Sequence, residues 1–166
     1  MLVYNVLDLI INVLRSFPFI ILIVFIIPLT RAIVGTPIGE AAAIVPLTIA
    51  AAPFVARIIE SSLKEVDSGV IEAAKSFGAS NTQIIFKVML KEAVPSIISG
   101  LTLTIINIIG YSAMAGSVGA GGLGKVAISY GYQRYQTDVM IVTVIILIIM
   151  VQGLQSLGNY LYKKLS

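Results

Sequence analysis

Four apolar stretches, each long enough to cross a lipid bilayer, constrain the fold more than any other feature of this sequence. They cover residues 17–35, 41–63, 93–115 and 139–162. A membrane span needs about 20 mostly apolar residues, and a helix satisfies its own backbone hydrogen bonds in lipid. Only 11% of the residues are charged, whereas soluble domains carry about 25%. The sequence therefore predicts an all-α integral membrane protein, with residues 1–166 forming one transmembrane domain.

The composition excludes several kinds of chemistry. The chain contains neither cysteine nor histidine, so it lacks thiolate nucleophiles, disulfides and the commonest general base and metal ligand. The stretch "GYSAM", from Gly110 to Met114, resembles a nucleophile elbow only faintly, because Met114 replaces the second glycine. We therefore expect no catalytic site, metal or cofactor. The small net charge of +3 does not indicate a nucleic-acid partner.

The stretch "VGAGGLGKV", residues 118–126, is close to a phosphate-binding P-loop, G-x-x-x-x-G-K-[ST]. Val126 stands where that motif needs a hydroxyl for Mg²⁺, and an apolar span precedes the glycines instead of a β-strand. We therefore expect a flexible external loop, whose glycines permit turns and close helix approach, and no ATP binding by this chain.

The basic residues predict the orientation of the spans. Seven lie on one side of an alternating four-span topology and three on the other. The positive-inside rule then places both termini and the 64–92 loop in the cytoplasm. The segment before the first span carries a polar stripe: Asn5, Asp8, Asn12 and Arg15. This segment either lies on the membrane surface or continues the span through a kink at Pro18.

The 64–92 loop holds an unusual share of the charged residues and predicts two short helices. Asp67 or Ser68 can cap the first, and Gly78 can end it in a left-handed turn. Ser80 and Gln83 have the spacing of a capping box for the second helix. Ile84, Ile85 and Val88 give this helix an apolar face. A loop with capped helices and an apolar face is typical of a surface that docks on another protein.

The same loop resembles the EAA motif of ABC-importer permeases: EAA, three residues, Gly, nine residues, Ile, one residue, Leu-Pro. Lys91 stands in the place of the motif's proline, and Pro95 is expected to mark a helix boundary instead. In that family the loop is a coupling helix that sits in a groove of the ATPase subunit. The resemblance and the apolar face together predict these coupling residues: Glu72, Ala73, Ala74, Gly78, Ile84, Val88 and Leu90.

Three further stretches, "RSFPFIILIVFIIPLTR", "AAIVPLTIAAAPFVAR" and "GYSAMAGSVGAGGLG", resemble permeases of D-/L-methionine importers. This resemblance implies a type I ABC-importer bundle in the bacterial cytoplasmic membrane, with ATP hydrolysed by a partner. The implied partners are two cytosolic ATP-binding subunits, a second copy of the permease and an extracytoplasmic methionine-binding lipoprotein. Such permeases have five spans, so four spans with a cytoplasmic N-terminus suggest a chain that is shortened at its start.

Polar residues in the third span indicate where a substrate path could run. Ser96, Gly100, Asn107, Tyr111 and Met114 share one helical face. Such a face either lines a water-filled path or holds helices together. The path candidates are Asn107, Tyr111, Ser112 and Met114.

Two alternatives to methionine import remain open from the sequence. One is a permease for another small amino acid or osmolyte. The other is a stand-alone channel or secondary transporter, but such proteins usually carry ionisable residues inside their spans. Here the span centres are neutral, which favours an external energy source.

Overall fold

The computed structural model describes residues 2–165, except for the side chains of Ser117 and Val118. These residues form helices and connecting turns, without a β-strand, which confirms the all-α prediction. In chain order the elements are α1 (Leu2–Ser16), α2 (Phe19–Phe25), α3 (Ile27–Val34), α4 (Glu40–Lys64), α5 (Ser68–Ser76), α6 (Asn81–Gln83), η1 (Ile84–Met89), α7 (Leu90–Ala115), η2 (Gly116–Ala120), α8 (Gly122–Val126), η3 (Ala127–Tyr132) and α9 (Thr137–Leu165). The η elements are single π-helical turns.

Three helical stretches are long and apolar enough to cross a membrane: Glu40–Lys64, Asn81–Ala115 and Thr137–Leu165. The first and last contain the predicted spans 41–63 and 139–162. The middle stretch is longer than the predicted 93–115, because α6, η1 and α7 run on as one helix of 35 residues. Pro95 lies inside α7, so the expectation that it marks a helix boundary was wrong.

The predicted first span, 17–35, is not one helix in the structure. Its residues form α2 and α3, which meet at Ile26, and α3 ends at Gly35 in a left-handed conformation with φ of 83°. The helices α1 and α2 instead form a pair that is bent by 104° and together meets the length and composition of a broken span. Pro18 precedes the first turn of α2 and has no backbone N–H to donate, which places the bend where the sequence put a possible kink.

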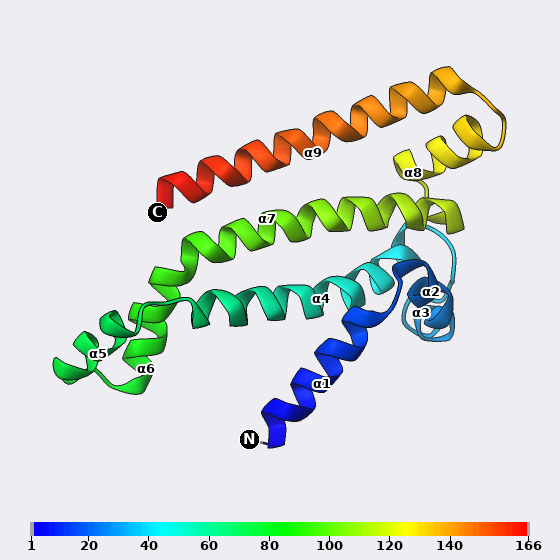
Figure 1. Cartoon of the computed structure of the whole chain (residues 1–166). Helices are drawn as coiled ribbons and strands as arrows, with labels where there is room; N and C mark the ends of the chain where they lie inside the picture. The colour runs from blue at the N-terminus through cyan, green and yellow to red at the C-terminus, as the bar shows by residue number, and fades with distance from the viewer. Residues whose placement is uncertain (1, 166) are drawn as a thin grey trace.

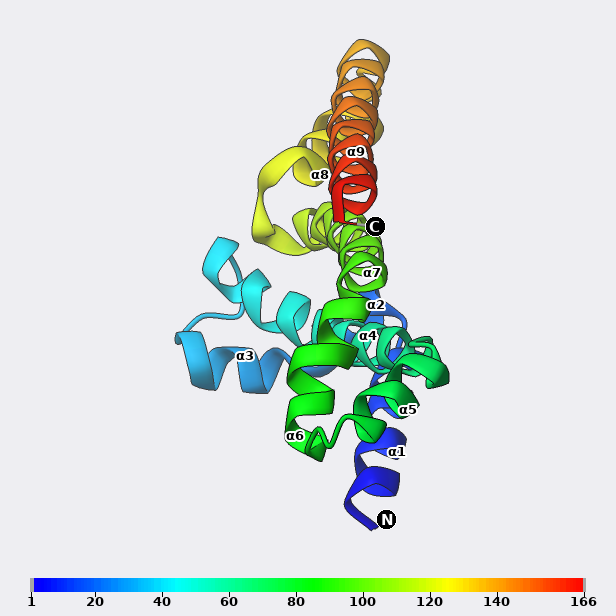
Figure 2. The same cartoon turned by 90° about the vertical axis from the view of Figure 1, so that its left-hand side faces the viewer.

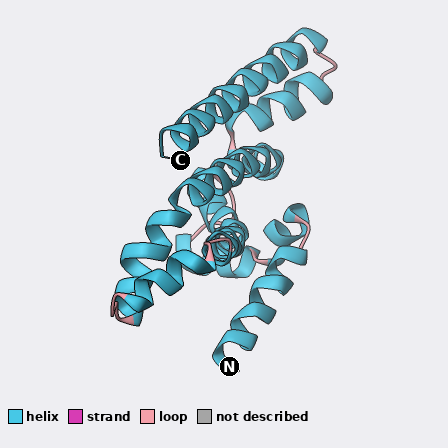
Figure 3. Ribbon diagram, turned by 60° about the vertical axis from the view of Figure 1, so that its left-hand side comes forward, coloured by secondary structure: helices cyan, strands magenta, loops and turns pink. Residues whose placement is uncertain are grey.

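The long helices lie in one row. Figure 1 shows α7 between α4 and α9, with α1 running beside α4. Figure 2, turned by 90°, keeps the same order from α9 down to α1. The short helices α5 and α6 lie at one end of the row, here called the loop end, and α2, α3 and α8 lie at the other, here called the glycine end (Figures 1 and 3).

A polar cluster joins α1 to α4. The Arg57 guanidinium donates to Asp8 at 2.6 Å and to Asn12 at 2.9 Å. Glu60 accepts from Arg57 and Lys64 on its own helix and from the Tyr4 hydroxyl at 2.7 Å. The polar stripe of the first segment therefore faces α4, and this segment continues into α2 through the bend.

The buried apolar core lies where the α2 region packs on α4 and α7. A buried cluster joins Phe19, Leu22, Ile23 and Ile26 of the α2 region to Ala50 of α4 and Ala115 of α7. Elsewhere the apolar side chains of the long helices are largely exposed: Ile149 of α9 is 65% exposed. In a membrane protein these surfaces meet lipid or neighbouring chains, since lipid tails are as apolar as the side chains.

The glycine-rich segment forms helical turns where the sequence predicted a flexible loop. It forms η2, reverses at Gly121 with φ of 82°, and continues as α8. Gly124 is buried, and a Cβ atom on it would lie 2.5 Å from the carbonyl carbon of Ala113. Here the glycines allow α8 to pack directly against the end of α7. The segment follows a helix and not a strand, so it has no P-loop architecture.

Candidate coupling surface and translocation path

The connection between α4 and α7 is a compact structure whose first helix, α5, is fixed by its cap. Only Glu65, Val66 and Asp67 separate α5 from α4. The Asp67 carboxylate accepts from the backbone N–H of Gly69 at 2.6 Å and of Val70 at 3.4 Å. These bonds satisfy donors that a helix start leaves free, and they confirm the predicted N-cap.

Gly78 ends α5 in the predicted left-handed turn, with φ of 78°. Its N–H donates to the Lys75 carbonyl at 2.9 Å, and the N–H of Ala79 donates to the Ala74 carbonyl at 3.1 Å. This pair of bonds is the Schellman motif, which favours glycine at the left-handed position. The turn therefore sets the angle between α5 and the next helix.

The next helix starts with a complete capping box. The Ser80 N–H donates to the Gln83 side-chain oxygen at 2.9 Å, and the Gln83 N–H donates to the Ser80 hydroxyl at 3.3 Å. From here the chain is helical to Ala115. The chain reverses at Gly78, and the second half of the loop, from Asn81, is therefore continuous with the span α7.

The predicted coupling residues fall into three groups by their exposure. Glu72, Ala73 and Gly78 are exposed, and Ala74, Val88 and Leu90 are half-buried. Ile84 is only 4% exposed and lies at the start of η1, which packs against α5. It holds the two helices of the loop together, so the expectation that it lies on a docking face was wrong.

Sequence reasoning missed the most exposed apolar residue of the loop. Phe77, the C-cap residue of α5, is 92% exposed, and Phe86 on η1 is 63% exposed. A bulky aromatic directly before a left-handed glycine was the available signal, because the turn leaves that side chain outside the helix pair. An exposed phenylalanine at the tip of a rigid loop suits contact with another protein.

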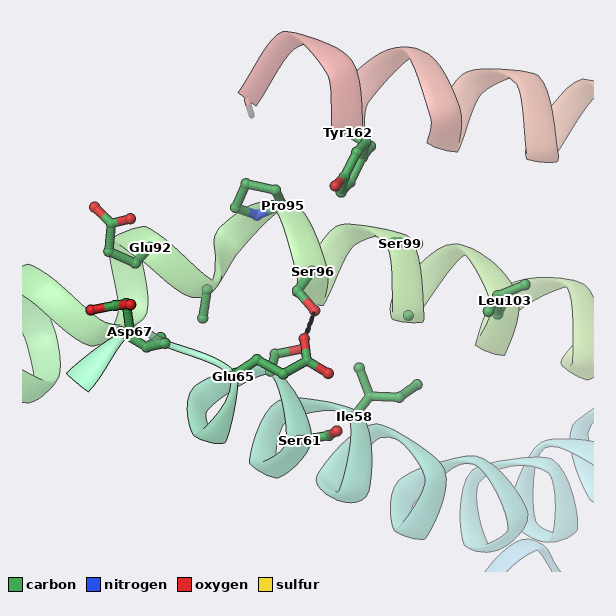
Figure 4. Close-up of a pocket in the computed structure, with 14 residues that line it drawn as sticks. Ile58, Ser61, Glu65, Asp67, Glu92, Pro95, Ser96, Ser99, Leu103 and Tyr162 are labelled. Carbon is green, nitrogen blue, oxygen red and sulfur yellow. Dashed lines mark hydrogen bonds between the residues drawn. The ribbon is translucent and has the colours of Figure 1, made fainter. Parts of the chain in front are cut away.

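A cavity of about 650 Å³ lies where the loop joins the long helices, and Figure 4 shows the residues that line it. The Ser96 hydroxyl of α7 donates to Glu65 at 2.9 Å, and the Ser62 hydroxyl of α4 donates to Ser96 at 3.1 Å. These bonds tie the start of the loop to both spans. The structure thus assigns Ser96, from the polar face of the third span, to helix contact.

The other residues of that polar face have different surroundings. A Cβ atom on Gly100 would collide with Ile58 of α4, so this glycine also serves helix packing. Tyr111 is half-buried and stacks on Phe19, with ring centroids 4.5 Å apart. Asn107, Ser112 and Met114 are exposed. The four path candidates lie close together on α7 but differ in burial, and Ser112 borders a separate cavity at the glycine end.

The described residues contain no group of three or more His, Cys, Asp or Glu side chains that could hold a metal ion. What they do contain is a row of long, largely exposed apolar helices and one rigid helical loop at its end. This combination defines a multi-pass helical membrane protein with a structured surface outside its spans.

Comparison with known proteins identifies the family of membrane proteins to which this chain belongs. The family described as "Binding-protein-dependent transport system inner membrane component" matches residues 2–166, and the chain belongs to this family. A probable D-methionine transport system permease protein of Vibrio cholerae is 56% identical over 93% of this chain and 69% of its own length. A methionine import system permease protein of Bacillus subtilis is 46% identical over 95% of this chain and 71% of its own length.

A solved structure shares the fold. It is described as an inward-facing conformation of the MetNI methionine ABC transporter. The match covers 99% of this chain and 76% of the chain in that structure. The TM-score is 0.94 at 48% sequence identity. These findings confirm the resemblance to ABC-importer permeases that the sequence motifs indicated.

Proposed function

We propose that this chain is the permease subunit of a methionine importer, and that its 64–92 loop couples it to a separate ATP-binding subunit. The observation that carries the proposal is the loop itself, a capped helix pair built rigidly onto α7 with the EAA residues on it. The names of the relatives, at 46–56% identity, support methionine as the substrate.

The geometry offers a mechanism for coupling. The capping box and the helix from Asn81 to Ala115 make the loop and the third span one rigid lever. The Ser62–Ser96–Glu65 bonds join the same loop to α4. A movement imposed on α5 by a partner would then tilt α4 and α7 together and change the opening at the glycine end.

The energy for this movement comes from the partner, because the glycine-rich segment lacks P-loop architecture. In the proposed assembly two copies of the permease carry two ATP-binding subunits, and an extracytoplasmic methionine-binding lipoprotein delivers the substrate. The positive-inside rule places the loop end and both termini of the chain in the cytoplasm.

Uptake by a reconstituted assembly tests the proposal. The chain is co-expressed with the ATP-binding subunit of a methionine importer, purified and placed in liposomes with a methionine-binding protein outside. We expect ATP-dependent accumulation of labelled methionine that unlabelled methionine inhibits and other small amino acids or osmolytes do not. Accumulation without ATP would indicate a channel or secondary transporter and contradict the proposal.

A further inference from the structure

A second cavity, of about 350 Å³, lies at the glycine end between α4, α7, α8 and α9. Much of its wall is apolar, with Leu47, Leu123, Leu147 and Met150 among the lining residues. The ionisable residue on its border is Glu40, in the first turn of α4, and Ser112 of α7 also lines it. Its size falls in the range of small-molecule sites, about 300–1,000 Å³.

The close packing of the glycine segment creates this cavity. A Cβ atom on Gly116 would lie 2.6 Å from the backbone nitrogen of Lys125, so only glycine lets α8 return so close to α7. A Cβ atom on Gly121 would lie 3.6 Å from Oε1 of Glu40. The exposed Glu40 carboxylate therefore lies beside the backbone of the turn and lines the cavity.

The polar side chains of the cavity can accept hydrogen bonds but have no hydrogen to give. Within residues 2–165, salt bridges join Asp8, Arg57, Glu60 and Lys64 only, so none engages Glu40. The Ser112 hydroxyl donates its hydrogen to the Ile109 carbonyl at 2.9 Å, which leaves its lone pairs as acceptors. A carboxylate and an accepting hydroxyl beside apolar walls suit a ligand with an ammonium group and an apolar chain.

Resting on the proposed function, we propose that this cavity receives the amino acid at the glycine end of the permease. Glu40 accepts from the substrate ammonium, and the apolar walls enclose the substrate side chain. Glu40 also occupies the first turn of a helix, where a negative charge is favourable by itself. Asp138 also lies in the first turn of its helix, α9, but does not line the cavity. It therefore separates an effect on the helix start from an effect on substrate binding.

Uptake assays with matched variants give the first test. Losing a hydrogen bond to a charged group costs about tenfold or more in binding. We expect Glu40→Gln to lower methionine uptake about tenfold at limiting substrate, Glu40→Asp to restore most of it, and Asp138→Asn to leave it unchanged. Basal ATP hydrolysis by the Asp138→Asn complex should equal that of the wild-type complex, which shows that the control variant assembles normally. Unchanged uptake by Glu40→Gln would overturn the inference.

Thiol labelling gives a second test that does not depend on transport. The chain has no cysteine, so Glu40→Cys and Asp138→Cys each carry one unique thiol in the assembled complex. We expect methionine to slow the reaction of a methanethiosulfonate reagent at position 40 and not at position 138. A reagent that leaves a sulfonate at position 40 should recover part of the uptake, whereas one that leaves a quaternary ammonium should not.

The outcomes distinguish this inference from the proposed function. If the wild-type complex takes up methionine while Glu40→Gln does so equally well and methionine does not protect position 40, only the inference fails. If the wild-type complex does not take up methionine at all, the proposed function itself is contradicted.

Discussion

Gly78 shows how one backbone conformation shapes the coupling surface. Its φ of 78° is costly for any residue with a side chain, by about 1–2 kcal/mol. A Cβ atom there meets nothing within 4 Å, and the same holds for Gly153 of α9, which has no left-handed φ. We expect Gly78→Val to weaken capture of the ATP-binding subunit and to lower methionine uptake, and Gly153→Val to change neither. Full capture by Gly78→Val would show that the turn does not set the docking geometry.

Phe77 gives a prediction that complements the one for Gly78. Its side chain should affect contact with the ATP-binding subunit and not the conformation of the loop. The side chain is 92% exposed, so Phe77→Ala should alter the stability of the isolated permease by less than about 0.5 kcal/mol. Aromatic anchors at interfaces cost about 2 kcal/mol or more when truncated. We therefore expect a loss of ATPase affinity of about tenfold or more, measured by titration with the purified subunit. Tyr132, which is 67% exposed at the glycine end, supplies the control, and Tyr132→Ala should bind the subunit normally.

At the scale of elements, the α1–α4 cluster should hold the first helix in place. Removing Arg57 takes the salt-bridge partner from the Asp8 carboxylate and leaves it only the hydrogen bond from the Asn12 amide. We expect Arg57→Met to lower the thermal stability of the purified protein in detergent. The double variant Arg57→Met with Asp8→Asn should lose less than the sum of the single variants. Strict additivity would mean that the pair does not couple the two helices.

The packing of α8 on α7 gives another prediction for elements. The Gly124 position has no room for a methyl group beside the backbone of Ala113. Forcing one in should cost about 1–3 kcal/mol and displace α8. We expect Gly124→Ala to lower thermal stability and to increase proteolysis of the glycine segment. Gly110→Ala, where a Cβ atom meets nothing within 4 Å, should be harmless, and equal behaviour of the two variants would contradict the packing account.

Across the whole molecule, the sequence correctly predicted the helix caps and turns, because each depends on residues that are neighbours in the chain. The Asp67 cap, the Gly78 turn and the Ser80–Gln83 box each depend on a few neighbouring residues, and all three are present. Three of the four apolar stretches likewise predicted the long helices, because helix formation in lipid requires little beyond length and hydropathy.

The features that the sequence did not predict depend on contacts between distant segments. Neither the burial of Ile84 nor the exposure of Phe77 follows from the periodicity of the loop, because both depend on how the turn at Gly78 packs η1 against α5. The sequence predicted a flexible loop for the glycine segment, because the residues of this segment do not themselves show that it packs against α7. Glu40 was not among the predicted site residues for the same reason: Gly121 and Ser112, far along the chain, place it beside a cavity.

Cross-linking from the 64–92 loop tests directly whether this loop contacts the ATP-binding subunit. A single cysteine is placed at Phe77→Cys or, as the control, at Tyr132→Cys, and a short bifunctional thiol reagent is added to the complex with a functional ATP-binding subunit. We expect a cross-link to that subunit from position 77, none from position 132, and a change in the yield at position 77 when ATP is bound. A complex that imports methionine and yields its cross-link from position 132 instead of position 77 would contradict the coupling role of the loop.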